Sequence, residues 1–278
     1  MLTAPELRAL LRRHGLRLTK RLGQHDLIDP QLVKRLIDAC RLSREDTVVE
    51  IGAGLGALTI PLAERAGRVI AVEVDKRIAE LLAQHVAHLK NVRVAHEDIL
   101  RFAWRDVPGA VVIGAIPYHI TSQIFVSLCE ARRTIQRVWL IVQQEYAERL
   151  LAQPGTKAYG RLSILGQFCW EMTRVMAVPR SAFFPQPVVD SSGIRLSPRF
   201  DPPLPAEEEA AFFEFVKAVF AHRRKTLANC LADEGWDMSR AGIQQRLREM
   251  DVSASVRGEA LSLDQLVHLY HALHYRFE

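Results

Sequence analysis

The sequence predicts an α/β protein built on a doubly wound parallel sheet, followed by a small helical domain. Short β-branched apolar runs alternate with helix-periodic segments through the first half of the chain. A glycine-rich turn directly follows the first of these runs. From residue 207 to the end, the apolar residues keep a helical period. At 278 residues the chain is long enough for one large domain and a smaller one.

The predicted sheet has five parallel strands, each separated from the next by a helix or a loop. The first strand, 47–51, ends in the glycine turn 52–56, and a helical segment follows at 57–66. The second strand, 69–74, precedes Asp75, which is well placed to cap a helix over 75–89. The remaining strands are expected at 91–98, 110–116 and 137–143. Strands that alternate with helices in this way imply right-handed crossovers.

The pattern changes after residue 143. A helix is expected at 145–153, the apolar segment 159–170 is ambiguous, and two extended segments at 171–179 and 187–198 could close the sheet as a hairpin. Three prolines within 200–205 mark a boundary. Helices are then expected at 207–224, 225–235, 239–250 and 262–275. The sequence therefore predicts a sheet domain at 1–200 and a helical domain at 201–278.

Composition narrows the class of protein. Apolar residues make up 49% and charged residues 25%, and no run of 18 apolar residues suggests a membrane span, so we expect a cytoplasmic protein. The four cysteines form no close pair, which argues against a zinc cluster or a disulfide framework and favours buried free thiols. The net charge is only +5, but residues 1–24 hold six basic side chains and one acid, and residues 222–225 form a second basic cluster. These two clusters could clamp a phosphate backbone.

Acids follow the predicted strands in an informative order. Glu73 ends the second strand, where a carboxylate can accept both ribose hydroxyls of an adenosine-containing cofactor. Glu50 could organise the glycine turn or reach a cofactor ammonium group, and Asp98 could accept from an adenine amino group. Each could also be an ordinary loop residue. The turn reads GAGLG and lacks the GxGxxG spacing of a pyrophosphate site, which disfavours a dinucleotide dehydrogenase and favours S-adenosyl-L-methionine, a cofactor without phosphate.

The tetrapeptide Ala115-Ile116-Pro117-Tyr118 is similar to a methyltransferase active-site motif with one side chain missing. Enzymes that methylate an exocyclic amine of a base usually carry Asn or Asp at the first position. The amide oxygen and the next backbone carbonyl accept the two amine hydrogens and aim the nitrogen lone pair at the methyl donor. Ala115 can supply only backbone to that arrangement.

Eight segments resemble the ribosomal RNA adenine N6,N6-dimethyltransferases of the bacterial small-subunit (KsgA) type. They are GLRLTKRLGQHDLID, VVEIGAGLGALT, AVEVD, HEDIL, GAIPYHI, FFPQPVVDS, VFAHRRKTLANCL and RGEALSLDQL. The resemblance implies a class I methyltransferase Rossmann-like sheet, with the methyltransferase domain at 1–200 and an RNA-docking helical domain at 201–278. It implies transfer of methyl groups from S-adenosyl-L-methionine to two adjacent adenines in the hairpin loop near the 3′ end of small-subunit rRNA. The expected partner is the small ribosomal subunit, the expected state is a monomer, and no metal is expected.

The resemblance also assigns residues. Cofactor contacts are expected from Gln24, His25, Leu27, Gly52, Glu73, Asp98 and Ala115. Catalytic positions are Ala115, Pro117, Tyr118 and Phe183, with Tyr118 and Phe183 stacking on the flipped adenine, although core packing is the alternative for both rings. The basic clusters themselves predict RNA docking by Arg223, Arg224 and Lys225 together with the N-terminal cluster, although a solvated helix face is the alternative for these three residues.

Four positions depart from the family pattern. Asp26 stands where the family usually has Phe, Val188 where Lys is common, and Gly193 where a strand residue is usually β-branched. Ala115 replaces the motif Asn and predicts impaired methyl transfer. Two alternatives therefore stay open: a non-catalytic small-subunit assembly factor, and a dimethyltransferase of large-subunit rRNA.

Overall fold

The computed structural model describes residues 3–16, 25–236 and 238–274, which divide into two compact units. Unit 1 comprises Met1–Ala147 and Met172–Pro198, and unit 2 comprises Glu148–Glu171 and Arg199–Glu278. Residues 148–169 thus group with the C-terminal helices, although they precede the last strands of the sheet. The functional domains 1–200 and 201–278 stay a prediction.

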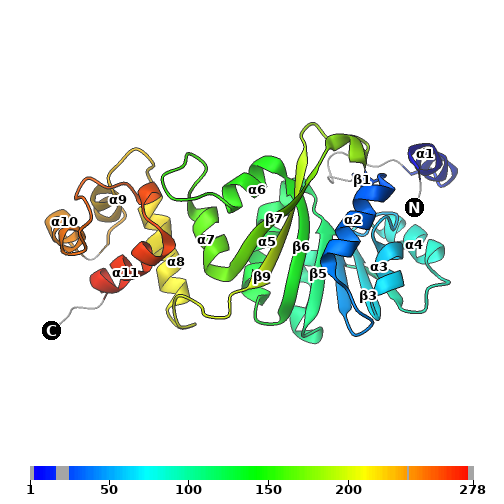
Figure 1. The fold of residues 1–278 in the computed structure, drawn as a ribbon, viewed down its shortest axis with the longest axis horizontal. Helices are drawn as coiled ribbons and strands as arrows, with labels where there is room; N and C mark the ends of the chain where they lie inside the picture. The colour runs from blue at the N-terminus through cyan, green and yellow to red at the C-terminus, as the bar shows by residue number, and fades with distance from the viewer. Residues whose placement is uncertain (1–2, 17–24, 237, 275–278) are drawn as a thin grey trace. The chain divides into compact units, whose positions relative to one another are not determined.

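Unit 1 is built on a seven-stranded sheet in the order β4-β3-β2-β5-β6-β9-β7 (Figure 1). The first four of these strands and β6 run parallel, and β9 pairs with β6 in the antiparallel sense. The bounds are β2 Thr47–Ile51, β3 Arg68–Glu73, β4 Val92–His96, β5 Ala110–Ala115, β6 Ile135–Gln143, β7 Trp170–Val178 and β9 Ser191–Pro198. The five predicted parallel strands are confirmed, and the two late extended segments are the neighbouring strands β7 and β9.

The central strands form because their side chains are apolar on both faces. Val48, Val49, Val111 and Val112 are all 0% exposed, as expected for a sheet that is covered on both sides. The helices of unit 1 are α1 Ala4–Arg13, α2 Pro30–Cys40, α3 Thr59–Arg65, α4 Lys76–His85 and α5 Thr121–Ala131. The side chain of Asp75 accepts hydrogen bonds from the N–H groups of Arg77 and Ile78, which confirms its prediction as the cap of α4.

A two-stranded antiparallel sheet joins an early segment to a late one. Strand β1 (Asp26–Leu27) pairs with β8 (Phe183–Phe184), with Asp26 opposite Phe184 and Leu27 opposite Phe183. More than 150 positions separate the paired strands along the chain, so their pairing is not visible in any local pattern. This small sheet fixes the orientation of the side chains at 26 and 27.

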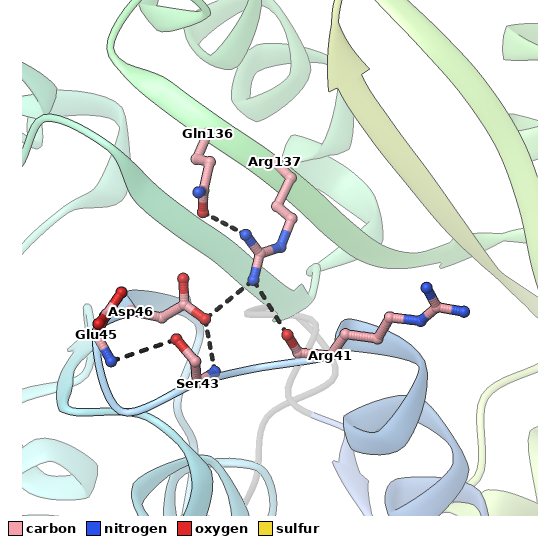
Figure 2. Close-up of polar contacts among 6 residues, drawn as sticks. All are labelled: Arg41, Ser43, Glu45, Asp46, Gln136 and Arg137. Atoms are coloured by element: carbon pink, nitrogen blue, oxygen red, sulfur yellow. Dashed lines mark hydrogen bonds and ion pairs between the residues drawn. The ribbon is translucent and has the colours of Figure 1, made fainter.

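An ion pair links two strands at the amino ends of the sheet (Figure 2). The Nη2 atom of Arg137, on β6, lies 3.0 Å from Oδ2 of Asp46, directly before β2, and also donates to the carbonyl of Arg41. Asp46 Oδ2 accepts from the N–H of Ser43 at 2.7 Å as well. Because parallel strands share their direction, this cluster lies at the end of the sheet opposite the residues that follow β2, β3 and β5.

Unit 2 is helical around an aromatic core. Its helices are α7 Arg161–Cys169, α8 Glu209–Val219, α9 Leu227–Asp233, α10 Arg240–Glu249 and α11 Leu263–His274, and α6 Gln144–Leu150 crosses the division between the units. Phe212, Phe215 and Tyr270 are at most 1% exposed, and their ring centroids lie 5.6 to 6.2 Å apart. The ambiguous segment 159–170 is α7 followed by the first residue of β7.

The predicted helix over 207–224 is wrong at its end, because α8 stops at Val219. Thr226 has extended backbone and precedes α9, so the chain must turn between the two helices. The basic residues 222–225 therefore lie on a loop. Short 3₁₀ turns occur at Ile99–Arg101, Trp104–Asp106, Tyr118–Ile120, Arg180–Ala182 and Gly258–Ala260.

Two further features bear on the sequence predictions. All four cysteines are buried free thiols, as predicted. Gly193 lies on β9 at a place where a β-carbon would come within 2.9 Å of Met176 Cγ, so the Met176 side chain occupies the space that a β-branched residue would need. Within residues 3–16, 25–236 and 238–274, no helix has the length and apolar character to cross a membrane.

Candidate functional site

A cavity of about 230 Å³ opens at the carboxyl ends of β2, β3 and β5, all within unit 1. This is the edge of a parallel α/β sheet where ligands bind. Six of the predicted site residues line this cavity: His25, Gly52, Glu73, Asp98, Ala115 and Pro117. The structure thus brings six predicted residues from five chain segments around one space. Asp26 and Gly54 line it too.

The glycine turn after β2 is held by Glu73. Gly54 donates its N–H to Oε2 of Glu73 at 3.0 Å, and the N–H of Asp75 donates to Oε1 at 3.0 Å. Gly52 and Gly54 have φ values of +70° and +53°, which glycine adopts without strain. Each carboxylate oxygen of Glu73 therefore uses one acceptor position for the backbone and keeps another for a ligand.

Glu50 does not line the cavity. Its side chain is 1% exposed and its Oε2 accepts a hydrogen bond from Thr59 Oγ1 at 2.6 Å, so it ties the end of β2 to the start of α3. Of the two roles considered for Glu50, the organisation of the turn is the one that its position supports.

Asp98 lies where the chain leaves β4. Its Oδ1 accepts from the N–H of Leu100 at 3.0 Å and begins a 3₁₀ turn. The carboxyl group is partly exposed and lines the cavity beside Ile99 and Leu100. Two carboxylates, those of Glu97 and Asp98, thus lie beside apolar residues at this part of the cavity, and the adenine contact of Asp98 stays a prediction.

The segment after β5 forms the other side of the cavity. Ala115 ends the strand and is partly buried, and Pro117 follows it on the cavity wall. The carbonyl of Pro117 accepts from the N–H of Ile120 at 3.2 Å and from Thr121 Oγ1 at 3.1 Å, which fixes the turn. Tyr118 is partly buried beside the cavity, and its hydroxyl lies 2.8 Å from Ser191 Oγ.

His25 connects three parts of the site. Its Nδ1 lies 2.6 Å from the carbonyl oxygen of Pro185, and its ring is stacked on that of Tyr118 with centroids 5.8 Å apart. The ring of Tyr118 is thus already engaged on one face by a side chain of the same site. Gln24, the neighbouring predicted cofactor contact, lies outside the described residues.

Two predicted site residues are buried in the core. Leu27 is 3% exposed and Phe183 is 4% exposed, both belong to one apolar cluster, and neither lines the cavity. In this conformation the ring of Phe183 has no free face for a base. Its stacking role therefore requires a movement of the β1–β8 sheet and stays a prediction, as does the cofactor contact of Leu27.

Acidic side chains dominate the charged residues of the cavity lining. Among the described residues, the cavity is lined by four acids and no Lys or Arg. Burial raises the pKa of Asp26 to about 7 and the pKa of Glu50 to about 8, and repulsion from Glu73 adds to both shifts. Burial also raises the pKa of Glu73, although the backbone N–H groups that it accepts oppose the rise. Such an environment favours a ligand that carries positive charge.

The predicted RNA-docking residues lie elsewhere, in unit 2. Arg223 donates to the carbonyl of Lys157 at 2.6 Å and forms an exposed ion pair with Glu259 at 3.2 Å. Lys225 pairs with Asp233 at 2.7 Å. Within the part of the chain that the structure describes, Arg224 is exposed and makes no ion pair, so it offers the least compensated charge of the three.

Sequence comparisons identify relatives over almost the whole chain. The family model described as ribosomal RNA adenine dimethylase matches residues 15–269. A ribosomal RNA small subunit methyltransferase A from Geobacillus sp. (strain WCH70) is 38% identical over 281 aligned residues, which covers 98% of this chain and 97% of the relative. The protein of the same name from Shouchella clausii (strain KSM-K16) is 37% identical, with 98% and 95% covered.

Solved structures agree with the sequence comparisons. A dimethyladenosine transferase from Plasmodium falciparum superposes with a TM-score of 0.76 at 26% identity, covering 87% of this chain and 95% of that protein. The 23S rRNA methyltransferase ErmE gives a TM-score of 0.71 at 28% identity, with 90% and 99% covered. The fold is therefore the class I methyltransferase Rossmann-like sheet with a C-terminal helical region that the sequence predicted.

Proposed function

The chain belongs to the ribosomal RNA adenine dimethylase family, and from this premise we propose that it methylates two adjacent adenines in the hairpin loop near the 3′ end of small-subunit rRNA. The family's reaction is rRNA adenine dimethylation with S-adenosyl-L-methionine as the methyl donor. The choice of the small subunit is supported by the names of the relatives that match at 37–38% identity.

The observation that carries the proposal is the meeting of three chemical elements around one cavity. Glu73 offers acceptors for ribose hydroxyls, Asp98 offers an acceptor for the adenine amine, and the segment from Ala115 to Tyr118 forms the side where a target base would enter. The lining acids and the absence of Lys and Arg among the described lining residues fit a cationic cofactor that has no phosphate.

Methyl transfer from a sulfonium leaves a neutral thioether, so it requires no metal and no strong general base. The task of the protein is to bind both reactants and to align them. Glu73, Asp98 and Gly52 would hold the cofactor, and Tyr118 and Pro117 would hold the base. Burial excludes water from the side of the cavity formed by Ile51 and Val72, which are at most 1% exposed.

Ala115 is the weak point of this arrangement. An Asn here would add an acceptor for the target amine, and the loss of one such hydrogen bond in a closed site is worth about 1–3 kcal/mol, or roughly 10- to 100-fold in rate. We therefore propose a methyltransferase whose chemical step is slow and whose cofactor and RNA binding are retained. The remaining assignments, a monomer that acts in the cytoplasm on small-subunit particles, belong to the same proposal.

A second candidate follows from the same residue. If Ala115 makes methyl transfer so slow that small subunits are not methylated, the protein would act as an assembly factor that binds immature small subunits. A third candidate, methylation of large-subunit rRNA, is supported only by the similarity to 23S rRNA methyltransferase ErmE.

The test is radiolabelled methyl transfer to three substrates: small subunits that lack the two dimethyladenines, large subunits, and protein-free rRNA. We expect incorporation into small subunits, at adenines that reverse transcription maps to the 3′-terminal hairpin. Incorporation only into large subunits would favour the third candidate. Tight binding to small subunits without any incorporation over many hours would favour the assembly factor.

A further inference from the structure

Asp26 is a partly buried side chain that lines the cavity, and the fold does not explain why a carboxylate stands there. Its Oδ1 accepts one long hydrogen bond, 3.4 Å from the N–H of Leu55. Among the described residues, its Oδ2 is buried without any hydrogen-bond partner. A buried carboxylate oxygen without a donor is costly, and such groups are rare unless a ligand or an ion completes them.

The direction of this side chain is fixed by the backbone. In the two-residue strand β1, the side chain of Leu27 points into the apolar core, so that of Asp26 points to the opposite face, which is the cavity. Pairing with Phe183 and Phe184 of β8 holds the strand in this register. The carboxylate also lies so close to the glycine turn that a β-carbon on Gly54 would collide with Oδ1.

Asp26 and Glu73 therefore approach the same turn from two sides. Glu73 accepts from the N–H of Gly54 and Asp26 from the N–H of the next residue, Leu55. Glu73 has the position of a ribose acceptor, and Glu50, which the sequence left as a partner for a cofactor ammonium, is occupied by Thr59 outside the cavity. Of these three carboxylates, Asp26 is the one that both lines the cavity and, among the described residues, has an oxygen without a hydrogen-bond partner.

We propose that Asp26 binds the α-ammonium group of S-adenosyl-L-methionine, so that this chain holds the amino-acid part of its cofactor through a carboxylate borne on β1. The inference rests on the proposed function, which supplies the cofactor. The ammonium is the group that fits, because it donates hydrogen bonds and carries a positive charge, whereas the sulfonium can donate none. Burial and repulsion from Glu73 raise the pKa of Asp26, and a bound cation would offset both effects.

The proposal also gives a reason for the departure from the family pattern. A Phe at position 26 could pack but could not bind an ammonium group. Ala115, which lines the same cavity, is a second departure, and there a polar side chain is lost where Asp26 adds one.

The test is calorimetric titration of the full chain and the Asp26→Asn variant with three ligands. S-adenosyl-L-methionine and S-adenosylhomocysteine both carry the ammonium, and 5′-methylthioadenosine lacks it. Asp26→Asn keeps the size of the side chain and removes its charge. We expect it to weaken the first two ligands by at least tenfold, by similar factors, and to leave 5′-methylthioadenosine within about twofold. Glu80→Gln, an exposed change on α4, serves as the matched control.

The outcomes distinguish a failure of the ammonium contact from a failure of the proposed function. If S-adenosyl-L-methionine does not bind the unaltered chain, the proposed function fails. If it binds and Asp26→Asn has no effect, or weakens all three ligands equally, the ammonium contact is wrong. Thermal unfolding without ligand gives a second reading: we expect Asp26→Asn to be as stable as the unaltered chain or more stable at pH 8. A marked loss of stability would instead show that the carboxylate of Asp26 is already stabilised in the free protein, which would contradict the premise of an unsatisfied oxygen.

Discussion

Replacement of Glu73 by Ala should abolish most of the affinity for the cofactor. Glu73 is 6% exposed and lines the cavity, and each of its carboxylate oxygens accepts a backbone hydrogen bond of 3.0 Å, which leaves acceptor capacity for a ligand. Two hydrogen bonds from ribose hydroxyls to a carboxylate are worth about 1.5–3 kcal/mol each. Their loss predicts at least about 100-fold weaker binding of S-adenosyl-L-methionine in calorimetry.

The Ala variant also removes acceptors from the N–H groups of Gly54 and Asp75, so weaker binding alone would not prove a ribose contact. A ligand pair isolates that contact. We expect the unaltered chain to prefer 5′-methylthioadenosine over its 2′-deoxy form by about tenfold, which corresponds to one hydrogen bond to a charged group, and Glu73→Ala to bind both equally. Affinity that stays within threefold in the variant, or a preference that survives the substitution, would refute the role of Glu73.

Three further predictions concern stability and RNA binding. The raised pKa values of Asp26 and Glu50 mean that the folded chain binds more protons than the unfolded chain between about pH 4 and pH 8. The free energy of unfolding of the cofactor-free protein should therefore fall as pH rises, by about 2 kcal/mol per group from pH 5 to 7. Urea unfolding should show this fall, and the double change Asp26→Asn with Glu50→Gln should flatten it. Asp46→Asn should lower the free energy of unfolding by about 1–3 kcal/mol, because it weakens the ion pair with Arg137 (Figure 2). Cofactor affinity should stay constant, because this ion pair lies at the end of the sheet opposite the cavity, and a changed affinity in calorimetry would contradict the prediction. Neutralising Arg223, Arg224 and Lys225 together should reduce the slope of log affinity for small subunits against log salt concentration by about one or two. Arg224→Gln should give the largest single change, because Arg223 and Lys225 already form ion pairs. An unchanged slope would show that the loop is solvated and does not contact RNA phosphates.

The sheet and the carboxyl-end site were predictable because their signals are local. The β-branched runs at 47–51 and 110–116 are short and are buried on both faces, and their length and β-branched residues favour strands over helices. Since parallel strands end at one edge, the residues after them had to meet, and Gly52, Glu73 and Ala115 do so around the cavity.

The remaining features depend on contacts between distant segments. A strand of two residues has no period to read, so neither the pairing of β1 with β8 nor the entry of Asp26 into the cavity could be foreseen. The same pairing buries Leu27 and Phe183, which the family pattern placed in the site. The end of α8 at Val219 was missed because residues 220–224 keep helical propensity, while the extended Thr226 forces a turn.

The central claim is that this chain is an adenine dimethyltransferase whose amine-orienting position is occupied by Ala115. The most direct measurement is the single-turnover rate of methyl transfer to unmethylated small subunits, compared between the unaltered chain and Ala115→Asn, with subunit affinity measured in parallel. Because the added side chain would contact the amine most effectively in the transition state and docking uses a much larger surface, we predict a rate at least tenfold higher and an affinity within about twofold. An equal rate in the two proteins, with cofactor bound in both, would contradict the claim.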